Sequence, residues 1–339
     1  MVQFSENTSL KEYNTFRVEA KARFFASVFS PDELKSLILN FQPGKIKHLI
    51  IGGGSNILFT KDFDGWLLHN EIKGMEITKE TTDEVFLKAG GGENWSDFVD
   101  YTVERDWGGL ENLSLIPGTV GAAPVQNIGA YGVEQAIAFD SLEACNLLTG
   151  KTCIFNKIEC DFGYRNSIFK ANERGKWFIL NVTYRLQKKP RIHLDYAPLR
   201  KAFENTPENQ ITVKSISNTV KHIRRSKLPD IKETGNAGSF FKNPVVRYEK
   251  FLRLQQRFPE IPFYRQQSGK VKIPAGWLIE QAGWKGKRMG NAGVHHQQAL
   301  VIVNYGNASG REILQLAQTV QKDVLKKFDI ALEPEVHIL

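Results

Sequence analysis

Two glycine-rich segments contain the residues best suited to hold a ligand. The first, Ile51-Gly52-Gly53-Gly54-Ser55-Asn56, follows a short apolar run. Glycine permits positive φ and close backbone approach, so successive N–H groups can converge on phosphate oxygens. The segment matches neither GxGxxG nor a Walker A loop. A tight turn therefore explains it as well as a phosphate site does.

The second segment, PGTVGAAPVQNIGAYG at 117–132, has four glycines and two prolines in sixteen residues. It offers few bulky side chains for a core of its own. We expect it to wrap a flat, polar ligand, with backbone N–H and C=O groups making the contacts. An irregular structural loop is the alternative.

Cysteine and histidine give little sign of chemistry. Cys145, Cys153 and Cys160 are spaced by 8 and 7 residues, which matches neither a disulfide framework nor a CxxC metal clip. We expect Cys160 to be a buried, inert thiol rather than a reactive one. HExxH is absent, so no metal is expected.

The composition is that of a folded chain with a modest positive charge. The 339 residues are 41% hydrophobic, and Lys+Arg 45 against Asp+Glu 37 gives +8. This excludes disorder, and the length predicts two or three domains. No apolar run approaches the ~18 residues of a membrane span, and the N-terminus lacks an export signal, so we expect a cytoplasmic protein with no membrane partner.

Basic residues gather at 188–191 and 221–227. Neither cluster is interleaved with aromatic residues of the kind that stack nucleic-acid bases. We therefore expect a small phosphorylated ligand and no nucleic acid, and the first cluster could equally be solvated surface charge.

Strands and helices alternate irregularly around these segments. Residues 24–28, 48–51, 65–69 and 85–89 are typical of strands, as is most of 140–186. Ser30-Pro31 predicts a helix start, another begins near Asn94, and 208–226 has helical spacing. These elements predict an α+β chain in which the first glycine-rich segment follows the strand at 48–51.

The last long helix has the clearest signals. Ser309-Gly310-Arg311-Glu312 is a capping-box pattern. The apolar stripe that follows consists of Ile313, Leu316, Ala317, Val320, Val324 and Phe328. We expect the helix to end near Asp329, followed by a short β segment and a turn at 333–335.

Five motifs resemble one enzyme family. GGGSN, LIPGTVGAAPVQNIGAYG, FGYRNSIF, GNAGSFFKNP and LEPEV occur in the order of the UDP-N-acetylenolpyruvoylglucosamine reductase (MurB) family and cover the chain from about residue 14 to its end. The resemblance implies an FAD-binding fold of the vanillyl-alcohol-oxidase/PCMH type in two subdomains, with an α+β substrate-binding domain. YAPL at 196 and FYRQQSGKVKIPAGWLIEQAG from 263 resemble the longer (type I) subtype, which has an extra substrate-covering loop.

On this resemblance we expect four parts. Residues 1–70 and 71–218 are the two FAD-binding subdomains, which hold FAD between them. Residues 219–325 bind the substrate, and residues 326–339 form a tail that returns to the active site.

The resemblance also implies the reaction and its residues. The family uses FAD and NADPH, and hydride passes to C3 of the enolpyruvyl ether of UDP-N-acetylglucosamine. Ser239 matches the proton donor to C2, Arg165 the cation that stabilises the enolate-like charge, and Glu335 the carboxylate that acts with it. We expect one pocket that admits NADPH and then the UDP-sugar, hence ping-pong kinetics. We also expect a monomer.

Binding residues follow from the same motifs. The cofactor contacts would be Ile51, Gly52, Gly53, Gly54, Ser55, Asn56, Pro117, Gly118, Gly121, Ala122, Asn127 and Gly129. The substrate contacts would be Tyr196, Arg224, Lys227, Asn243, Tyr264, Lys285 and Gln298. The cationic members suit a diphosphate, whereas the tyrosines could equally be packing residues.

Two positions depart from the family pattern. Ala122 stands where serine is frequent, which puts a hydroxyl contact to the flavin in doubt. His337 stands where arginine is common, which predicts a weaker phosphate contact or a pH-dependent affinity. Another FAD-dependent oxidoreductase of this fold, and an inactive nucleotide-sugar binding protein, are the alternative functions.

Overall fold

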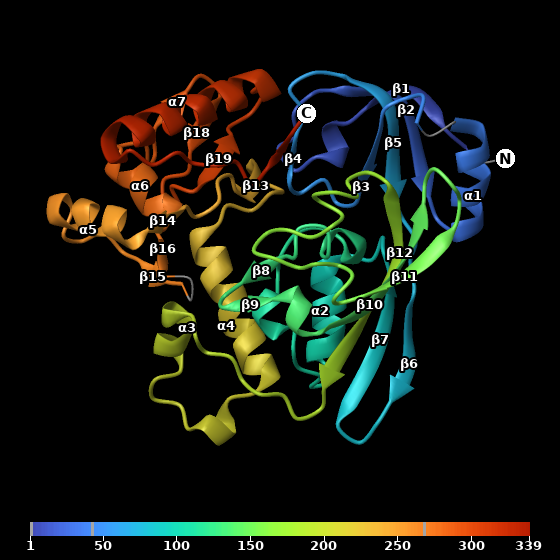
Figure 1. Cartoon of the computed structure of the whole chain (residues 1–339), viewed down its shortest axis with the longest axis horizontal. Coiled ribbons are helices and arrows are strands. Elements are labelled where there is room, and N and C mark those ends of the chain that lie inside the picture. Colours follow the sequence, from blue (N-terminus) through green and yellow to red (C-terminus); the bar gives the residue numbers. More distant parts are fainter. Residues whose placement is uncertain (1–2, 42–43, 267–268) are drawn as a thin grey trace. The chain divides into compact units, whose positions relative to one another are not determined.

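The computed structural model describes residues 3–41, 44–266 and 269–339 (Figure 1). The chain forms two compact units, each assembled from separate stretches. Unit 1 consists of Met1–Thr8, Ala22–Gly53 and Phe63–Ser226; unit 2 consists of Ser9–Lys21, Gly54–Asp62 and Lys227–Leu339. The first glycine-rich segment thus contributes residues to both units.

In the first sheet of unit 1, one strand runs directly into the first glycine-rich segment. The order of this sheet is β1-β2-β5-β3, and both β2 and β3 run parallel to β5. The strands are β1 Ser5–Ser9, β2 Lys21–Val28, β5 Phe63–Asn70 and β3 His48–Ile51. Helix α1, Pro31–Phe41, joins β2 to β3, and the Ser30 hydroxyl accepts the Glu33 N–H at 3.2 Å. The predicted N-cap is confirmed.

The second sheet of unit 1 is antiparallel, in the order β11-β10-β12-β7-β6. Its strands are β11 Thr152–Asn156, β10 Phe139–Asn146, β12 Trp177–Gln187, β7 Glu84–Gly90 and β6 Met75–Glu80. Helix α2, Trp95–Val103, starts after Asn94, whose side chain accepts two backbone N–H bonds. Trp95 and Phe98 of α2 pack on Tyr184 of β12. This aromatic cluster fixes α2 against β12.

The helix predicted over 208–226 begins later. Glu208–Gln210 is a separate 3₁₀ turn, and α4 spans Val213–Lys227. The Thr212 hydroxyl accepts the Ser215 N–H at 3.0 Å, which caps the helix there. The apolar face is as expected, and α4 packs with the short helix α3, Ala197–Ala202.

Residues 111–137, which include the second glycine-rich segment, contain only short regular pieces. These are the 3₁₀ turns Glu111–Leu113, Val120–Ala122 and Gln135–Ile137 and the paired strands β8 Gly129–Ala130 and β9 Val133–Glu134. Most of the second glycine-rich segment is therefore loop.

In unit 2 a four-stranded sheet, β13-β19-β18-β17, packs against α7 (Figure 1). The elements are β13 Gly235–Ser239, β17 Arg288–Met289, β18 Ala292–Val294, β19 Val301–Asn304 and α7 Gly310–Phe328. The capping box of Ser309 and Glu312 is present, and Asp329 ends the helix at φ +54°. The predicted apolar stripe is buried, so this prediction is confirmed.

Smaller elements complete unit 2. They are the 3₁₀ turn Lys11–Tyr13, β4 Ile57–Leu58, β14 Val245–Arg247, α5 Tyr248–Arg257, β15 Tyr264–Arg265, β16 Lys270–Lys272, α6 Ala275–Gln281 and β20 His337–Ile338. The expected β segment before residue 333 and the expected turn at 333–335 are both wrong. Residues 330–333 are irregular, Pro334 forms a β-bridge with Phe241, and β20 follows and pairs with β4. Residues 267–268 of the 263–283 stretch lie outside the described residues.

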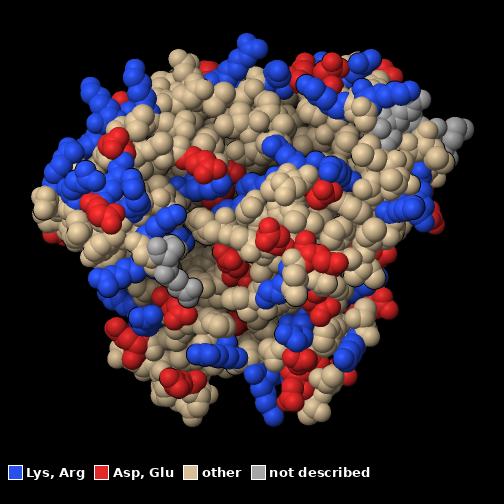
Figure 2. Space-filling model, in the orientation of Figure 1, with Lys and Arg blue, Asp and Glu red and all other residues tan. Residues whose placement is uncertain are grey.

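The surface carries charge of both signs. On the face drawn in Figure 2, Lys and Arg side chains gather over α5, which contributes Lys250, Arg253 and Arg257. The two basic clusters are partly neutralised, since Lys188 pairs with Glu80 at 2.7 Å and Lys221 with Asp100 at 2.6 Å. Within the described ranges no helix is long and apolar enough to cross a membrane.

Candidate active site

Parts of the two glycine-rich segments lie against each other in unit 1. A Cβ at Gly52 would collide with the Thr119 hydroxyl, and one at Gly53 would lie 3.1 Å from the Gly118 Cα. The loop is held from its other side as well, because Trp95 N–H donates to the Gly118 carbonyl at 3.0 Å. The two glycine-rich segments that the sequence indicated are therefore in contact with each other in the fold.

A third glycine cluster belongs to this structure and was not assigned to the site. Gly121 N–H donates to the Gly91 carbonyl at 2.8 Å, and a Cβ at Gly121 would lie 2.9 Å from the Gly91 Cα. Ala122, beside it, lies in a 3₁₀ turn. The run Gly90-Gly91-Gly92 was the available sequence signal, because three glycines after a strand indicate close backbone approach.

The residues around Gly52 fit the phosphates of a dinucleotide cofactor such as the expected FAD. Thr119 Oγ1 is shielded from solvent and has no hydrogen-bond partner in the described part of the chain. A buried hydroxyl without a partner is costly, so an acceptor supplied by a ligand would relieve it. Glycines that leave no room for a Cβ also allow backbone N–H groups to approach phosphate oxygens.

In unit 2 the end of the first segment contacts the C-terminal tail. Gly54 has φ +59°, and a Cβ there would collide with the Tyr13 carbonyl oxygen. The Asn56 side chain donates to the Glu335 carbonyl at 3.3 Å, and the Asn56 carbonyl accepts the His337 N–H at 2.9 Å. Asn56 thus holds the tail on both sides of residue 336.

Ser239 lies at the end of β13, just after an irregularity in the strand. The pairing with β19 shifts register between Asn236 and Ser239, where Gly238 has φ +65°. The buried Asn236 side chain accepts the Gly238 N–H at 2.9 Å and donates to the Thr234 carbonyl at 2.8 Å. Such bulges redirect a side chain, and here the half-buried Ser239 is the residue redirected.

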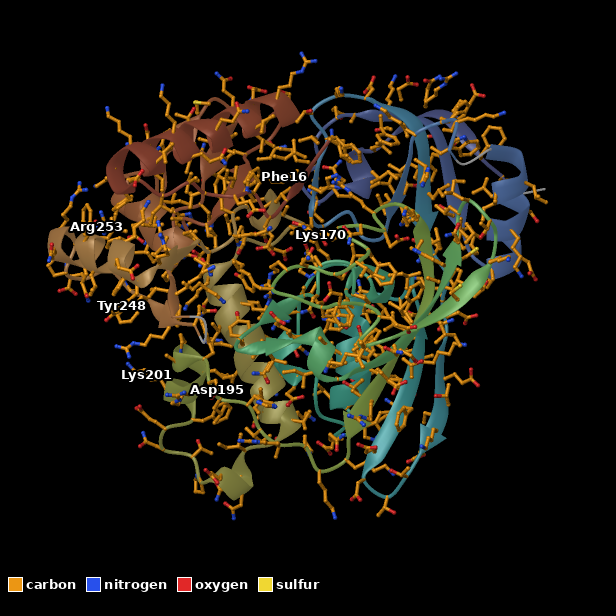
Figure 3. The ribbon with its side chains drawn as sticks, viewed as in Figure 1. Phe16, Lys170, Asp195, Lys201, Tyr248 and Arg253 are labelled. Carbon is orange, nitrogen blue, oxygen red and sulfur yellow. The ribbon has the colours of Figure 1, made fainter. Side chains whose placement is uncertain are left out.

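Glu335 is brought beside Ser239 by backbone pairing. Its N–H donates to the carbonyl of Phe240, the residue after Ser239, at 2.8 Å. Phe241 forms a β-bridge with Pro334 on the same path. The Phe240 ring packs edge-on against Phe16 (labelled in Figure 3), 6.2 Å apart by ring centroids. Two of the three expected catalytic residues therefore share one corner of unit 2.

Arg165 lies in unit 1, in a tight turn after residues 160–163. Its φ is +53°, and Gly163 and Asn166 exchange backbone hydrogen bonds of 3.0 and 3.1 Å across it. The guanidinium donates to the Gly129 carbonyl, while Lys170 (labelled in Figure 3) donates to the Arg165 carbonyl at 3.2 Å. The turn and the second glycine-rich segment therefore fix this cation together.

The expected substrate residues of unit 1 form an aromatic and cationic group. Tyr196 precedes α3, and its ring meets that of Tyr131 edge-on at 5.1 Å. Arg224 donates from Nε to the Leu115 carbonyl at 3.1 Å. Burial lowers the pKa of Arg224 and raises that of Tyr131, and the hydrogen bond joining the two opposes both shifts. Tyr131, inside a recognised motif, was not assigned to the site.

The remaining expected substrate residues lie in unit 2 and are less closely held. Lys227 ends α4 and is exposed, as is Tyr264 on β15. Asn243 accepts the Ala275 N–H at 2.9 Å at the start of α6. Lys285 pairs with Glu280 at 2.8 Å, and Gln298 accepts the Leu300 N–H at 3.4 Å.

Cysteine behaves as expected. Cys160 is fully buried, and burial raises the pKa of its thiol to about 12, which keeps it protonated and inert. No group of three His, Cys, Asp or Glu side chains placed to hold a metal ion occurs in residues 3–41, 44–266 and 269–339.

Comparison with known proteins identifies the family. Residues 230–339 match the profile of the UDP-N-acetylenolpyruvoylglucosamine reductase C-terminal domain, and residues 22–154 match an FAD binding domain. A UDP-N-acetylenolpyruvoylglucosamine reductase of Flavobacterium johnsoniae is 49% identical over 339 residues, covering 100% of both chains. This chain belongs to the MurB family. A Pseudomonas putida protein with the same name is 46% identical over 337 residues and covers 99% of both chains.

A solved structure supports the fold. The UDP-N-acetylenolpyruvylglucosamine reductase (MurB) of Thermus caldophilus matches with a TM-score of 0.66 at 22% identity, covering 100% of this chain and 98% of that one. The MurB resemblance and the expected FAD-binding fold are confirmed.

Proposed function

We propose that this protein reduces UDP-N-acetylglucosamine enolpyruvate to UDP-N-acetylmuramate with NADPH, through FAD, in peptidoglycan precursor synthesis. The observation that carries the proposal is full-length similarity to proteins of that name. The pairing of Glu335 with the residue after Ser239 supports it.

FAD would be held chiefly by the backbone of the glycine-rich segments around Gly52, Gly53 and Gly118. When bound, it would supply the redox chemistry by which hydride from NADPH reaches the enolpyruvyl C3. Gly121, Ala122 and Gly129 extend the same surface of unit 1. Thr119 joins them as a hydroxyl donor to the cofactor.

Ser239 donates its proton to C2 as hydride reaches C3, so that H⁻ and H⁺ together saturate the double bond. A serine hydroxyl is a weak acid, and its transient alkoxide therefore needs a nearby hydrogen-bond donor. Glu335, in a protonated or hydrogen-bonded form, assists from the neighbouring tail. A proton from solvent restores Ser239 after the product leaves.

Arg165 balances the negative charge that develops from C2 to the carboxylate. A guanidinium held in place before the reaction needs no reorganisation as that charge appears, which makes such groups effective. The fixed contacts to Gly129 and the turn backbone supply this preorganisation.

Substrate binding is assigned to Tyr196, Arg224, Lys227, Asn243, Tyr264, Lys285 and Gln298, with the cations on the diphosphate. The chain fits the longer subtype, since β15, β16 and α6 occupy the 263–283 stretch. We further propose FAD subdomains at 1–70 and 71–218, a substrate domain at 219–325, a tail at 326–339, a cytoplasmic location and a monomer.

The test is Ser239→Ala, followed anaerobically in two half-reactions. NADPH should still bleach the flavin absorbance at a near-normal rate. Recovery of absorbance on adding the enolpyruvyl substrate should slow by roughly 10²- to 10⁴-fold, since general-acid catalysis is lost. Gln318→Ala, an exposed change on α7, is the control.

Equal slowing of both half-reactions would remove the proton-donor role from Ser239. Bleaching without recovery in the unaltered protein would favour another flavin oxidoreductase, and no flavin binding at all would favour an inactive binding protein.

A further inference from the structure

The Arg165 turn and the second glycine-rich segment are joined at four positions in unit 1. The pairs are Ser167 Oγ to the Val125 carbonyl (2.6 Å), Lys170 Nζ to Gln126 Oε1 (3.4 Å), Asn127 Nδ2 to the Gly163 carbonyl (3.1 Å) and the Arg165 guanidinium to the Gly129 carbonyl. The donor is a side chain in every pair. The conformation of each loop therefore depends on the other.

Asn127 makes more side-chain hydrogen bonds than the other residues that join the loops. The residue is 1% exposed, and its side-chain amide makes four hydrogen bonds. Nδ2 donates to Glu134 Oε2 at 2.8 Å and to the Gly163 carbonyl, while Oδ1 accepts the Ala136 N–H at 3.2 Å and Gln135 Nε2 at 3.3 Å. Two donors and two acceptors exhaust the usual capacity of an amide. Any contact of Asn127 with FAD must then come from its main chain.

The network continues into the core of unit 1. Gln135, which is fully buried, accepts a hydrogen bond from the Tyr184 hydroxyl at 3.0 Å. Tyr184 is fully buried on β12, among the rings that pack α2 against the sheet. Asn127 is thus anchored through Gln135 to a rigid part of the fold.

Two residues of the joined loops are held in strained conformations. Asn127 has φ +46° and Arg165 has φ +53°. A left-handed conformation is unfavourable for residues other than glycine, less so for asparagine than for arginine, and it persists only where the surroundings determine it. For the Arg165 turn, Asn127 provides that determination by binding the Gly163 carbonyl, two residues before Arg165.

We propose that Asn127 is a positioning residue for Arg165. Its amide links the rigidly packed residues around Tyr184 to the turn through hydrogen bonds, and it thereby fixes the position of the guanidinium. Removing the amide leaves the Ala136 N–H unpaired and leaves the Gly163 carbonyl with only the Asn166 N–H of its own turn, so the turn loses its tie to the core and relaxes toward ordinary φ values. Arg165 then spends little time in its catalytic position. This inference rests on the proposed role of Arg165.

The first experiment compares Asn127→Ala with Asn70→Ala in the two half-reactions. Asn70 is also buried in unit 1, where its side chain donates to the Ile179 carbonyl at 2.8 Å and accepts the Ile72 N–H at 3.2 Å, so its loss controls for the removal of a buried amide from this unit. In Asn127→Ala the substrate half-reaction should slow on the order of 10²-fold, as misplaced catalytic groups do, while bleaching by NADPH and FAD affinity change little. In Asn70→Ala the ratio of the two rates should stay as in the unaltered protein.

The second variant, Asn127→Asp, keeps the shape and tests the donor directly. At neutral pH its carboxylate would face Glu134 and the Gly163 carbonyl, so the bond is lost and like charges repel. At acidic pH, once both carboxyl groups are protonated, the aspartic acid O–H can again donate to the Gly163 carbonyl, while the Glu134 O–H donates to the aspartic acid. The substrate half-reaction should therefore recover as the pH falls, which Asn127→Ala should not do.

The possible outcomes distinguish a failure of the proposed function from a failure of the positioning role of Asn127. If the unaltered protein fails to recover flavin absorbance with the substrate, the proposed function fails. If it does recover, then equal slowing of both half-reactions in Asn127→Ala, or an Asn127→Asp rate without acid recovery, overturns the positioning role. If Asn127→Ala does not fold, the pH profile of Asn127→Asp decides alone.

Discussion

At the scale of single residues, the stability of unit 2 depends on Gly54 of the first glycine-rich segment, which packs against the Tyr13 carbonyl. We expect Gly54→Ala to lower the free energy of unfolding by about 3 kcal/mol, because left-handed strain adds to a collision with the Tyr13 carbonyl. Gly150 has φ +68° with nothing within 4 Å of a Cβ, so Gly150→Ala isolates the strain. Urea unfolding of both variants measures the difference, and equal losses would show that the collision has no effect.

Cys160 makes unit 1 sensitive to alkali. The unfolded thiol ionises near pH 9, whereas in the folded state its pKa is about 12 because it is buried. Above pH 9 the folded state therefore binds more protons than the unfolded state, and stability falls by about 1.4 kcal/mol per pH unit from this group. Urea unfolding between pH 8 and pH 10.5 should show a shallower decline for Cys160→Ala, and parallel declines would contradict the assignment.

The motifs indicated segments that contact one another in the structure, but not what each side chain contacts. Asn127 and Asn56 were both expected at the cofactor. The Asn127 amide instead serves Glu134 and Gly163, and the Asn56 amide binds the Glu335 carbonyl. These partners lie up to 279 positions away in sequence, so no local pattern could indicate them.

At the scale of elements, α7 is the best specified helix because its signals are local. Ser309→Ala should destabilise unit 2 by about 1 kcal/mol through loss of the cap. Gln318→Ala lies on the exposed face of the same helix and should be near neutral or slightly stabilising, since alanine favours helix. Thermal unfolding compares the two, and similar melting temperatures would refute the cap's contribution.

Elements without local signals were harder to place. The start of α4 depended on whether Thr212 or an earlier residue caps the helix, and 208–212 offers several polar candidates. β20 has two residues and exists because β4 pairs with it, which its own sequence does not indicate. Periodicity and caps specify long elements, whereas short strands follow from tertiary pairing.

At the scale of the whole molecule, each unit is assembled from three separate stretches of the chain. Residues 9–21 and 54–62 join the C-terminal part in unit 2, which composition and periodicity could not show. The motif series nonetheless predicted the family and the fold, because five motifs in one order are specific to a family. The five motifs supply residues to both units, and it is their order along the chain that identifies them.

The central claim is that this chain carries out both half-reactions of a UDP-N-acetylenolpyruvoylglucosamine reductase. The most direct test is the visible absorption spectrum of the purified protein, followed without oxygen while NADPH and then UDP-N-acetylglucosamine enolpyruvate are added. We predict a flavin band that bleaches with NADPH and returns with the substrate, with UDP-N-acetylmuramate as product. A band that bleaches and does not return, or no band even after FAD is added, would contradict the claim.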